Sequence, residues 1–111
     1  ERSDIIPQTF VLHPNMPNPF NPETMIRFEL PYRIPARLEV FDALGQRVVT
    51  LVSGVLPAGV HEVMWDGHDQ AGTPVSSGLY LYRLRAGGWR SDVSNSANFR
   101  FEQVHRMLLI K

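Results

Sequence analysis

The sequence has 111 residues, of which 43% are hydrophobic, and its 11 Lys and Arg residues balance 11 Asp and Glu residues. This length and apolar content suit one domain around a single core, and the balanced charge gives no whole-chain case for binding nucleic acid or an anionic membrane surface. The absence of Cys excludes disulfides and Cys-ligated zinc, but it leaves cytosolic, periplasmic and secreted locations open.

The chain begins with a polar stub and without Met. This start lacks the basic and apolar regions of a signal peptide, and no run in the chain approaches the roughly 20 apolar residues that span a bilayer. We therefore expect residues 1–9 to be a linker from an upstream domain, residues 10–111 to form the domain, and no segment to cross a membrane.

The domain is predicted to open with a short strand and a Pro-rich crossing. Phe10 to Leu12 is compatible with an edge strand. Prolines then forbid continued ladder pairing because each lacks an N–H group, and they stand at positions 14, 17, 19 and 22. Within this crossing we expect Met16 and Phe20 to anchor the chain to the core.

Alternating segments follow. Thr24 to Leu30 alternates with period two, which is typical of a half-buried strand whose even-numbered residues face the core. Arg37 to Phe41 and Gln46 to Val52 alternate in the same way on either side of a turn at Asp42 to Gly45, where Gly supplies a positive φ. These two segments are predicted to form a hairpin.

Two further segments, Val60 to Trp65 and Leu79 to Arg85, flank a connection rich in Asp, Gly, Ser and Pro. They are predicted to pair as a central, long-looped hairpin with Trp65 and Tyr80 facing the core. Phe99 to Lys111 is predicted to be the last strand. About seven short strands, separated by Gly, Pro and Asn turns and without a long helical period, predict an all-β fold, a small antiparallel β-sandwich.

A series of motifs runs in order along the chain: NMPNPFNPET at 15–24, VFDALGQ at 40–46, WDG at 65–67 and MLLIK at 107–111. Together they resemble type A C-terminal sorting domains of the type IX secretion system, and the resemblance spans residues 10–111. It implies an immunoglobulin-like β-sandwich, similar also to the Ig-like domain of flagellar hook-capping proteins. The connection at Gly88 to Arg100 departs from the family pattern, because it is longer than usual.

The resemblance also implies a function. Sorting domains are recognised after export to the periplasm and direct an upstream cargo domain across the outer membrane to the cell surface, so the expected partners are the outer-membrane secretion and surface-attachment machinery. An apolar strand that ends in a cation is a suitable address for strand addition onto a partner. The expected recognition residues are Met107, Leu108, Leu109, Ile110 and Lys111.

Other residues allow further sites. Asp66 and Asp69 could coordinate calcium, which prefers several oxygen ligands, or they could cap amides in Asx-turns. Trp89, with Tyr32 as a second platform, could stack on a sugar ring, or it could pack on its own loop. The arginines of the last two strands form either a basic stripe or a solvated face; they are Arg83, Arg85, Arg90, Arg100 and Arg106.

Patterns typical of enzymes are missing from the sequence. The histidines do not form a paired-His spacing, no Ser lies in a nucleophile elbow, and the glycines do not form a phosphate loop. We expect no catalytic activity and no cofactor. The alternative to a sorting domain is an Ig-like structural spacer or a glycan-binding accessory module of an extracellular enzyme.

Overall fold

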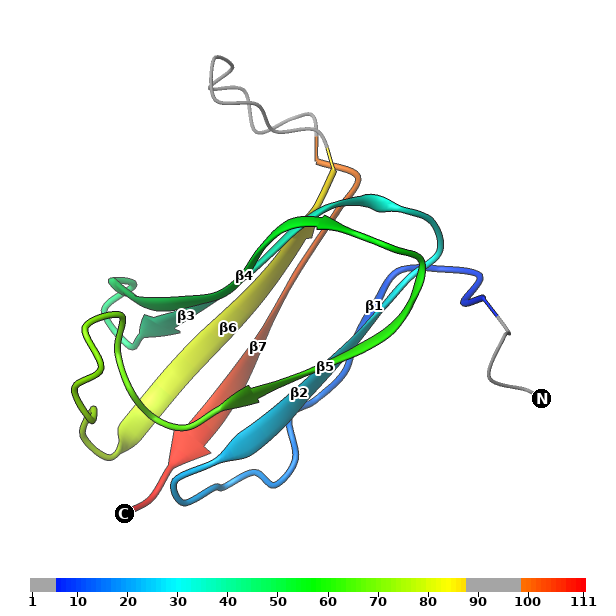
Figure 1. Ribbon diagram of the computed structural model, residues 1–111. Helices are drawn as coiled ribbons and strands as arrows, with labels where there is room; N and C mark the ends of the chain where they lie inside the picture. Colours follow the sequence, from blue (N-terminus) through cyan, green and yellow to red (C-terminus); the bar gives the residue numbers. More distant parts are fainter. Residues whose placement is uncertain (1–5, 88–98) are drawn as a thin grey trace.

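The computed structural model describes residues 6–87 and 99–111 as two antiparallel sheets packed face to face, with no helix in this part of the chain (Figure 1). The strands are β1 (Val11–Leu12), β2 (Thr24–Leu30), β3 (Ile34–Asp42), β4 (Arg47–Leu56), β5 (Gly59–Trp65), β6 (Gly78–Ala86) and β7 (Phe101–Leu109). One sheet has the order β1-β2-β5 and the other β4-β3-β6-β7. The predicted sandwich of about seven strands is confirmed. In the described part of the chain, no helix is long and apolar enough to cross a membrane.

The three-stranded sheet is built on β2, whose alternation places every second residue in the core. β1 pairs with β2 through Val11 opposite Glu29 and is the edge strand that the sequence predicts. β5 pairs with the other side of β2, from Thr24 opposite Trp65 to Leu30 opposite Gly59.

The four-stranded sheet contains the predicted hairpin of β3 and β4. Asp42 organises its turn, because one carboxylate oxygen accepts the N–H groups of Leu44 and Gln46, each at 2.9 Å, and Gly45 has φ +85°. β6 lies between β3 and β7, and β7 is confirmed as a strand at the edge of this sheet.

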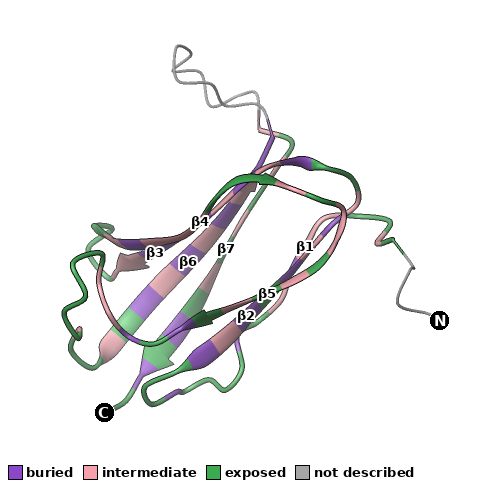
Figure 2. Cartoon of the chain, in the orientation of Figure 1, coloured by how far each residue is buried: buried purple, intermediate pink, exposed green. Residues whose placement is uncertain are grey.

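The core lies between the sheets, and buried residues alternate with more exposed ones along β6 and at the end of β7 (Figure 2). Every strand contributes to it. The core side chains are Leu12, Phe20, Ile26, Phe28, Leu30, Ile34, Ala36, Leu38, Val40, Val49, Trp65, Tyr80, Tyr82, Leu84, Ala86, Met107 and Leu109.

Tyr82 is a fully buried member of this core with a polar hydroxyl group. Its hydroxyl donates to the carbonyl oxygen of His13 at 2.7 Å, so the buried donor is satisfied and the segment after β1 is tied to β6. Burial raises the pKa of Tyr82 from 10.0 to about 12, because the charged phenolate is disfavoured away from water.

The predicted hairpin between Val60 to Trp65 and Leu79 to Arg85 is wrong. β5 pairs with β2, whereas β6 pairs with β3 and β7 in the other sheet. The connection at 66–77 therefore crosses from one sheet to the other (Figure 1). The predicted faces are nevertheless right, since Trp65 and Tyr80 are both buried.

The Pro-rich crossing also differs in part from the prediction. Phe20 is buried as expected, but Met16 is 72% exposed. Met16 forms a backbone bridge with Met25 of β2, and this pairing turns its side chain to the outer face of the sheet. Asn15 takes the inward position instead, and its amide donates to the hydroxyl of Thr24 at 2.9 Å.

Candidate recognition surface at the C-terminal strand

The expected recognition residues divide between the two faces of β7. Met107 and Leu109 are buried in the core, with 1% and 0% exposure. Leu108, Ile110 and Lys111 are exposed. From Met107 to Ile110 this division follows the period of a strand, in which neighbouring side chains point to opposite faces, and Lys111 lies beyond the end of β7. The segment is therefore anchored by two residues and presents the other three to solvent.

The outer edge of β7 is covered near its end by the Pro-rich crossing. The N–H of Phe20 donates to the carbonyl of Leu108, and the N–H of Ile110 donates to the carbonyl of Phe20, each at 3.0 Å. The side-chain oxygen of Asn18 accepts the N–H of Leu108 at 3.0 Å. Lys111 is held as well, because its N–H donates to the hydroxyl of Ser77 at 2.9 Å. An incoming strand at this edge would have to displace Asn18 and Phe20.

Aromatic rings support this end of the sandwich. Phe20 packs against Trp65 with ring centroids 5.7 Å apart, and Trp65 packs edge-on against Tyr80 at 5.4 Å. The indole N–H of Trp65 donates to the carbonyl of His68 at 3.0 Å, which satisfies a buried donor. The crossing, β5, β6 and β7 therefore meet at one packed end, which fixes where the exposed residues of β7 are presented.

The exposed residues of β7 continue onto β6. Leu108 lies directly opposite Leu79, and the two are 39% and 42% exposed. Further along the same face, a shallow cavity of about 210 Å³ is lined by Phe41, Gly45, Leu81, Arg83 and Val104. The outer face of the four-stranded sheet thus carries accessible apolar side chains from β3, β6 and β7.

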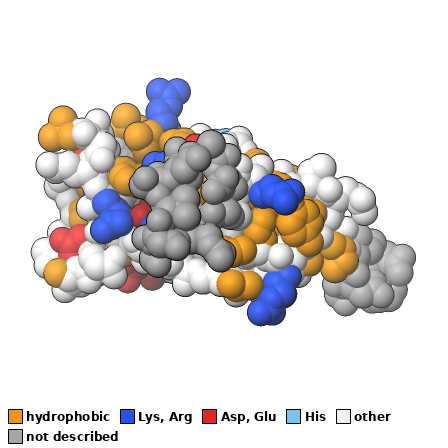
Figure 3. All heavy atoms as spheres, turned by 90° about the horizontal axis from the view of Figure 1, so that it is seen from above, with side chains coloured by type: hydrophobic (Ala, Val, Ile, Leu, Met, Phe, Trp, Pro, Cys, Tyr) orange, Lys and Arg blue, Asp and Glu red, His pale blue; other side chains and the backbone are white. Residues whose placement is uncertain are grey.

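Two of the arginines of the last two strands are matched by acids. Arg83 lies 3.0 Å from Glu39, which is only 3% exposed and also contacts Arg47 at 3.3 Å. Arg85 lies 2.8 Å from Glu102. Seen from the end where β6 finishes, the Lys and Arg side chains of the described residues lie as separate groups (Figure 3). β6 and β7 pair, as a basic stripe requires, but the ion pairs of Arg83 and Arg85 interrupt the stripe. Arg90 lies outside the described residues.

Asp66 and Asp69 cap amides in the crossover. A carboxylate oxygen of Asp69 accepts the N–H groups of Ala71 at 3.0 Å and Thr73 at 2.9 Å, and Asp66 accepts the N–H of His68 at 3.2 Å. Within the described residues, no cluster of three or more His, Asp or Glu side chains is placed to hold a metal. The Asx-turn interpretation accounts for both residues, and calcium binding stays a prediction.

Of the two aromatic residues expected to stack on a glycan, only Tyr32 lies in the described part of the chain. Trp89 lies outside the described residues, as does most of the connection at Gly88 to Arg100. Tyr32 is 44% exposed and packs edge-on against Phe10, with ring centroids 5.6 Å apart. The ring is therefore available on one side, and glycan stacking stays a prediction.

The comparisons with known proteins agree with this architecture. A family model described as FlgD Ig-like domain matches residues 18–88, which is more than half of the chain. The chain belongs to the FlgD Ig-like domain family. The match covers β2 to β6 and leaves β7 outside it. No curated protein matches the chain.

Two solved structures match this FlgD Ig-like domain over a larger share of the chain than the family model does. Dimeric latent PorU from Porphyromonas gingivalis matches with a TM-score of 0.66 and 17% identity over 91% of the chain, which corresponds to 9% of the PorU chain. FLGD from P. aeruginosa matches with a TM-score of 0.56 and 22% identity over 78% of the chain and 61% of that chain. The chain thus spans less than two thirds of either protein, and at these identities the likeness shows the fold.

Sequence reasoning missed the residues that cover the sheet edges. Neither Asn18 nor Gln70 was singled out as an edge partner, yet Asn18 accepts the N–H of Leu108 and Gln70 accepts the N–H of Thr50 on β4 at 2.9 Å. Both are amide side chains in turn-rich segments, and an amide can both donate and accept as a peptide group does. That chemistry is the one signal in the sequence that marks them as edge partners.

Proposed function

We propose that this FlgD Ig-like domain is a non-catalytic sorting and attachment module. It directs an upstream secreted protein from the periplasm across the outer membrane to the cell surface. Its partners are the outer-membrane secretion and attachment machinery, which contact the exposed side chains of Leu108, Ile110 and Lys111. Met107 and Leu109 act through the core by fixing the position of the other three.

The observation that carries the proposal is the division of the terminal motif between core and solvent. Two buried residues anchor the segment, and the backbone of the exposed three is held by hydrogen bonds to the backbone of Phe20 and to the hydroxyl of Ser77. A partner therefore meets an ordered surface and loses little affinity to ordering the segment. The order of motifs along residues 10–111, which resembles that of type IX sorting domains, supports the same role.

The test is surface delivery of a secreted reporter fused to this chain in a host with a type IX system. A triple variant with Leu108→Ser, Ile110→Ser and Lys111→Ala removes the exposed side chains and keeps both core anchors. We expect the parent fusion to reach the cell surface and the triple variant to accumulate in the periplasm.

A matched control separates recognition from loss of fold. Val60 is 53% exposed on β5, in the other sheet, so Val60→Ser removes an exposed apolar side chain from a different surface. Resistance to trypsin would verify the fold of each variant. Equal delivery of the triple variant and the parent would reject recognition through these side chains, and no delivery of the parent fusion would reject the sorting role.

The second candidate is a structural spacer. Membership of the FlgD Ig-like domain family favours it, because the family match covers β2 to β6 without the terminal motif. A spacer orients its neighbours and does not need Leu108 or Lys111. It predicts that the parent fusion and the triple variant have the same location, and that neither is delivered by the type IX system.

A further inference from the structure

We infer that the outer face of the three-stranded sheet carries a binding site for a soft monovalent metal ion, Cu(I) or Ag(I), formed by Met16, Met25 and Met64. The three methionines lie in one row across the sheet. Met25 is directly opposite Met64 in the pairing of β2 with β5. On its other side, Met25 exchanges two backbone hydrogen bonds with Met16, of 3.0 and 2.8 Å.

The methionine row is exposed to solvent, whereas methionines that serve in core packing are buried. Met16 and Met64 are 72% and 47% exposed, and Met25 is partly exposed. The remaining methionine of the chain, Met107, is 1% exposed and packs in the core. Methionine is usually buried because its side chain is apolar, so three adjacent exposed ones call for another interaction.

Thioether chemistry favours a soft ion. Cu(I) prefers soft sulfur ligands, and Met provides them without needing to lose a proton. Directly opposed residues of paired strands have Cβ atoms about 5 Å apart. The side chain is unbranched and turns freely about three bonds, so neighbouring sulfurs such as those of Met25 and Met64 can approach a shared ion without movement of the backbone.

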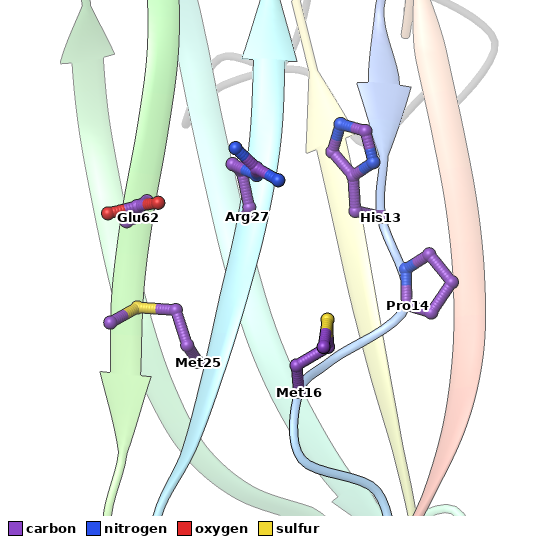
Figure 4. A pocket seen from close by; sticks show the side chains of 6 residues that line it. All are labelled: His13, Pro14, Met16, Met25, Arg27 and Glu62. Atoms are coloured by element: carbon purple, nitrogen blue, oxygen red, sulfur yellow. The ribbon is translucent and has the colours of Figure 1, made fainter.

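A hollow lies beside the row. It has a volume of about 300 Å³ and is lined by His13, Pro14, Met16, Met25, Arg27 and Glu62. Figure 4 shows the sulfur-bearing side chains of Met16 and Met25 next to a second row formed by Glu62, Arg27 and His13. An ion held by the methionines would sit at the edge of this hollow, with the imidazole of His13 nearby.

The second row suits such an ion in two ways. The Nε2 atom of His13 lies 2.6 Å from a carboxylate oxygen of Glu29, and when Nε2–H donates to this oxygen, Nδ1 keeps a lone pair that can bind a metal. The guanidinium of Arg27 opposes a cation, but Glu29 and Glu62 on the same face supply two carboxylates. The local formal charge therefore favours a monovalent cation.

The test uses the whole chain with methyl-labelled methionine, titrated with Ag(I) in a chloride-free buffer and with Cu(I) under anaerobic conditions. We expect the methyl resonances of Met16, Met25 and Met64 to shift and saturate together, while that of Met107 stays in place. Zn(II) at the same concentrations is the control for a harder ion and should leave all of them unchanged.

Two substitutions of similar volume locate the site. Met25→Leu removes the central sulfur and should weaken Ag(I) binding by about tenfold or more. Met107→Leu removes the buried sulfur and should leave binding unchanged. Equal affinity of Met25→Leu and the parent, equal shifts with Zn(II), or no shifts with Ag(I) would each overturn the inference, and the row would then be an apolar surface for contact with protein.

Discussion

The side-chain oxygen of Asn18 accepts the backbone N–H of Leu108 at 3.0 Å, so an amide side chain takes the place of a neighbouring strand at the edge of β7. Gln70 does the same at the opposite edge of this sheet, where it accepts the N–H of Thr50 on β4. Uncovered edges invite pairing with other chains. Both outer strands of the four-stranded sheet are thus covered in part by loops from elsewhere in the chain.

Asn18→Ala is expected to lower the free energy of unfolding by about 1 kcal/mol, because the N–H of Leu108 loses its partner. Urea unfolding of parent and variant measures the change. Asn21→Ala is the matched control, since Asn21 is an exposed Asn that also precedes Pro, and its side chain forms no hydrogen bond within the described residues. Equal losses in the two variants would contradict an edge-covering role for Asn18.

Gly67→Ala should destabilise the domain more than Gly72→Ala. Both glycines have positive φ, +78° and +86°, so each substitution brings backbone strain of about 1 kcal/mol. A Cβ on Gly67 would also lie 3.3 Å from the carbonyl oxygen of Pro22 and 3.8 Å from Leu109, whereas one on Gly72 meets nothing within 4 Å. The difference between the thermal midpoints of the two variants measures the cost of the contact between the new Cβ and the carbonyl oxygen of Pro22. Equal midpoints would show that the chain around Gly67 relaxes to remove this contact.

Glu39→Gln tests the buried ion pair on the outer face. Glu39 is 3% exposed between Arg83 and Arg47, so loss of its charge should lower the free energy of unfolding by about 2 kcal/mol. Glu102→Gln breaks a pair with Arg85 in which Glu102 is 43% exposed, and it should have an effect below about 1 kcal/mol. Chemical denaturation ranks the two variants, and a larger effect at Glu102 would refute the explanation by burial.

The buried hydroxyl of Tyr82 should make the domain sensitive to alkali. Its pKa is about 12 in the folded protein against 10.0 in the unfolded chain, so the neutral form stabilises the fold fully below pH 10.0. That contribution is lost as the pH rises from 10.0 to about 12, because only the unfolded chain ionises readily there. Urea unfolding across this range should show that the free energy of unfolding falls less with rising pH for Tyr82→Phe than for the parent. Equal falls for the two proteins would contradict this role of the Tyr82 hydroxyl.

Alternation along the chain was sufficient to predict which residues face the core. Phe28, Trp65 and Tyr80 lie where a period of two places them, because each strand has one face toward the other sheet. Only Met16 was assigned to the wrong side. The pairing of Met16 with Met25 decides its direction, and no pattern within the Pro-rich segment contains that information.

Alternation could not predict which strands pair. The segments Val60 to Trp65 and Leu79 to Arg85 could pair as a central hairpin or lie in two different sheets. Both arrangements bury the same apolar faces, so the alternation pattern in the sequence is compatible with either. The choice depends on the long-range pairing of β5 with β2. In a sandwich, consecutive strands often change sheets, and the residues at 66–77 fit either connection.

The sequence marks a candidate recognition segment but does not predict how its residues are presented. The position of Met107 to Lys111 at the end of an apolar segment marked it as a candidate. Its division into buried and exposed residues follows from the register of β7 against β6, and the cover over its edge follows from Asn18 and Phe20. Those two residues come from the start of the chain, so local patterns carry no sign of the contact.

The crossover at 66–77 divides the chain into two parts that are joined covalently at this one connection. The first part contains β1 to β5, with all of the three-stranded sheet, and the second contains the β6–β7 hairpin, which inserts beside β3. A chain cut after Gln70 would leave two fragments whose shared surface is the hydrophobic core itself. The fold is therefore suited to fragment complementation, with the second fragment adding to the first as a two-stranded ribbon.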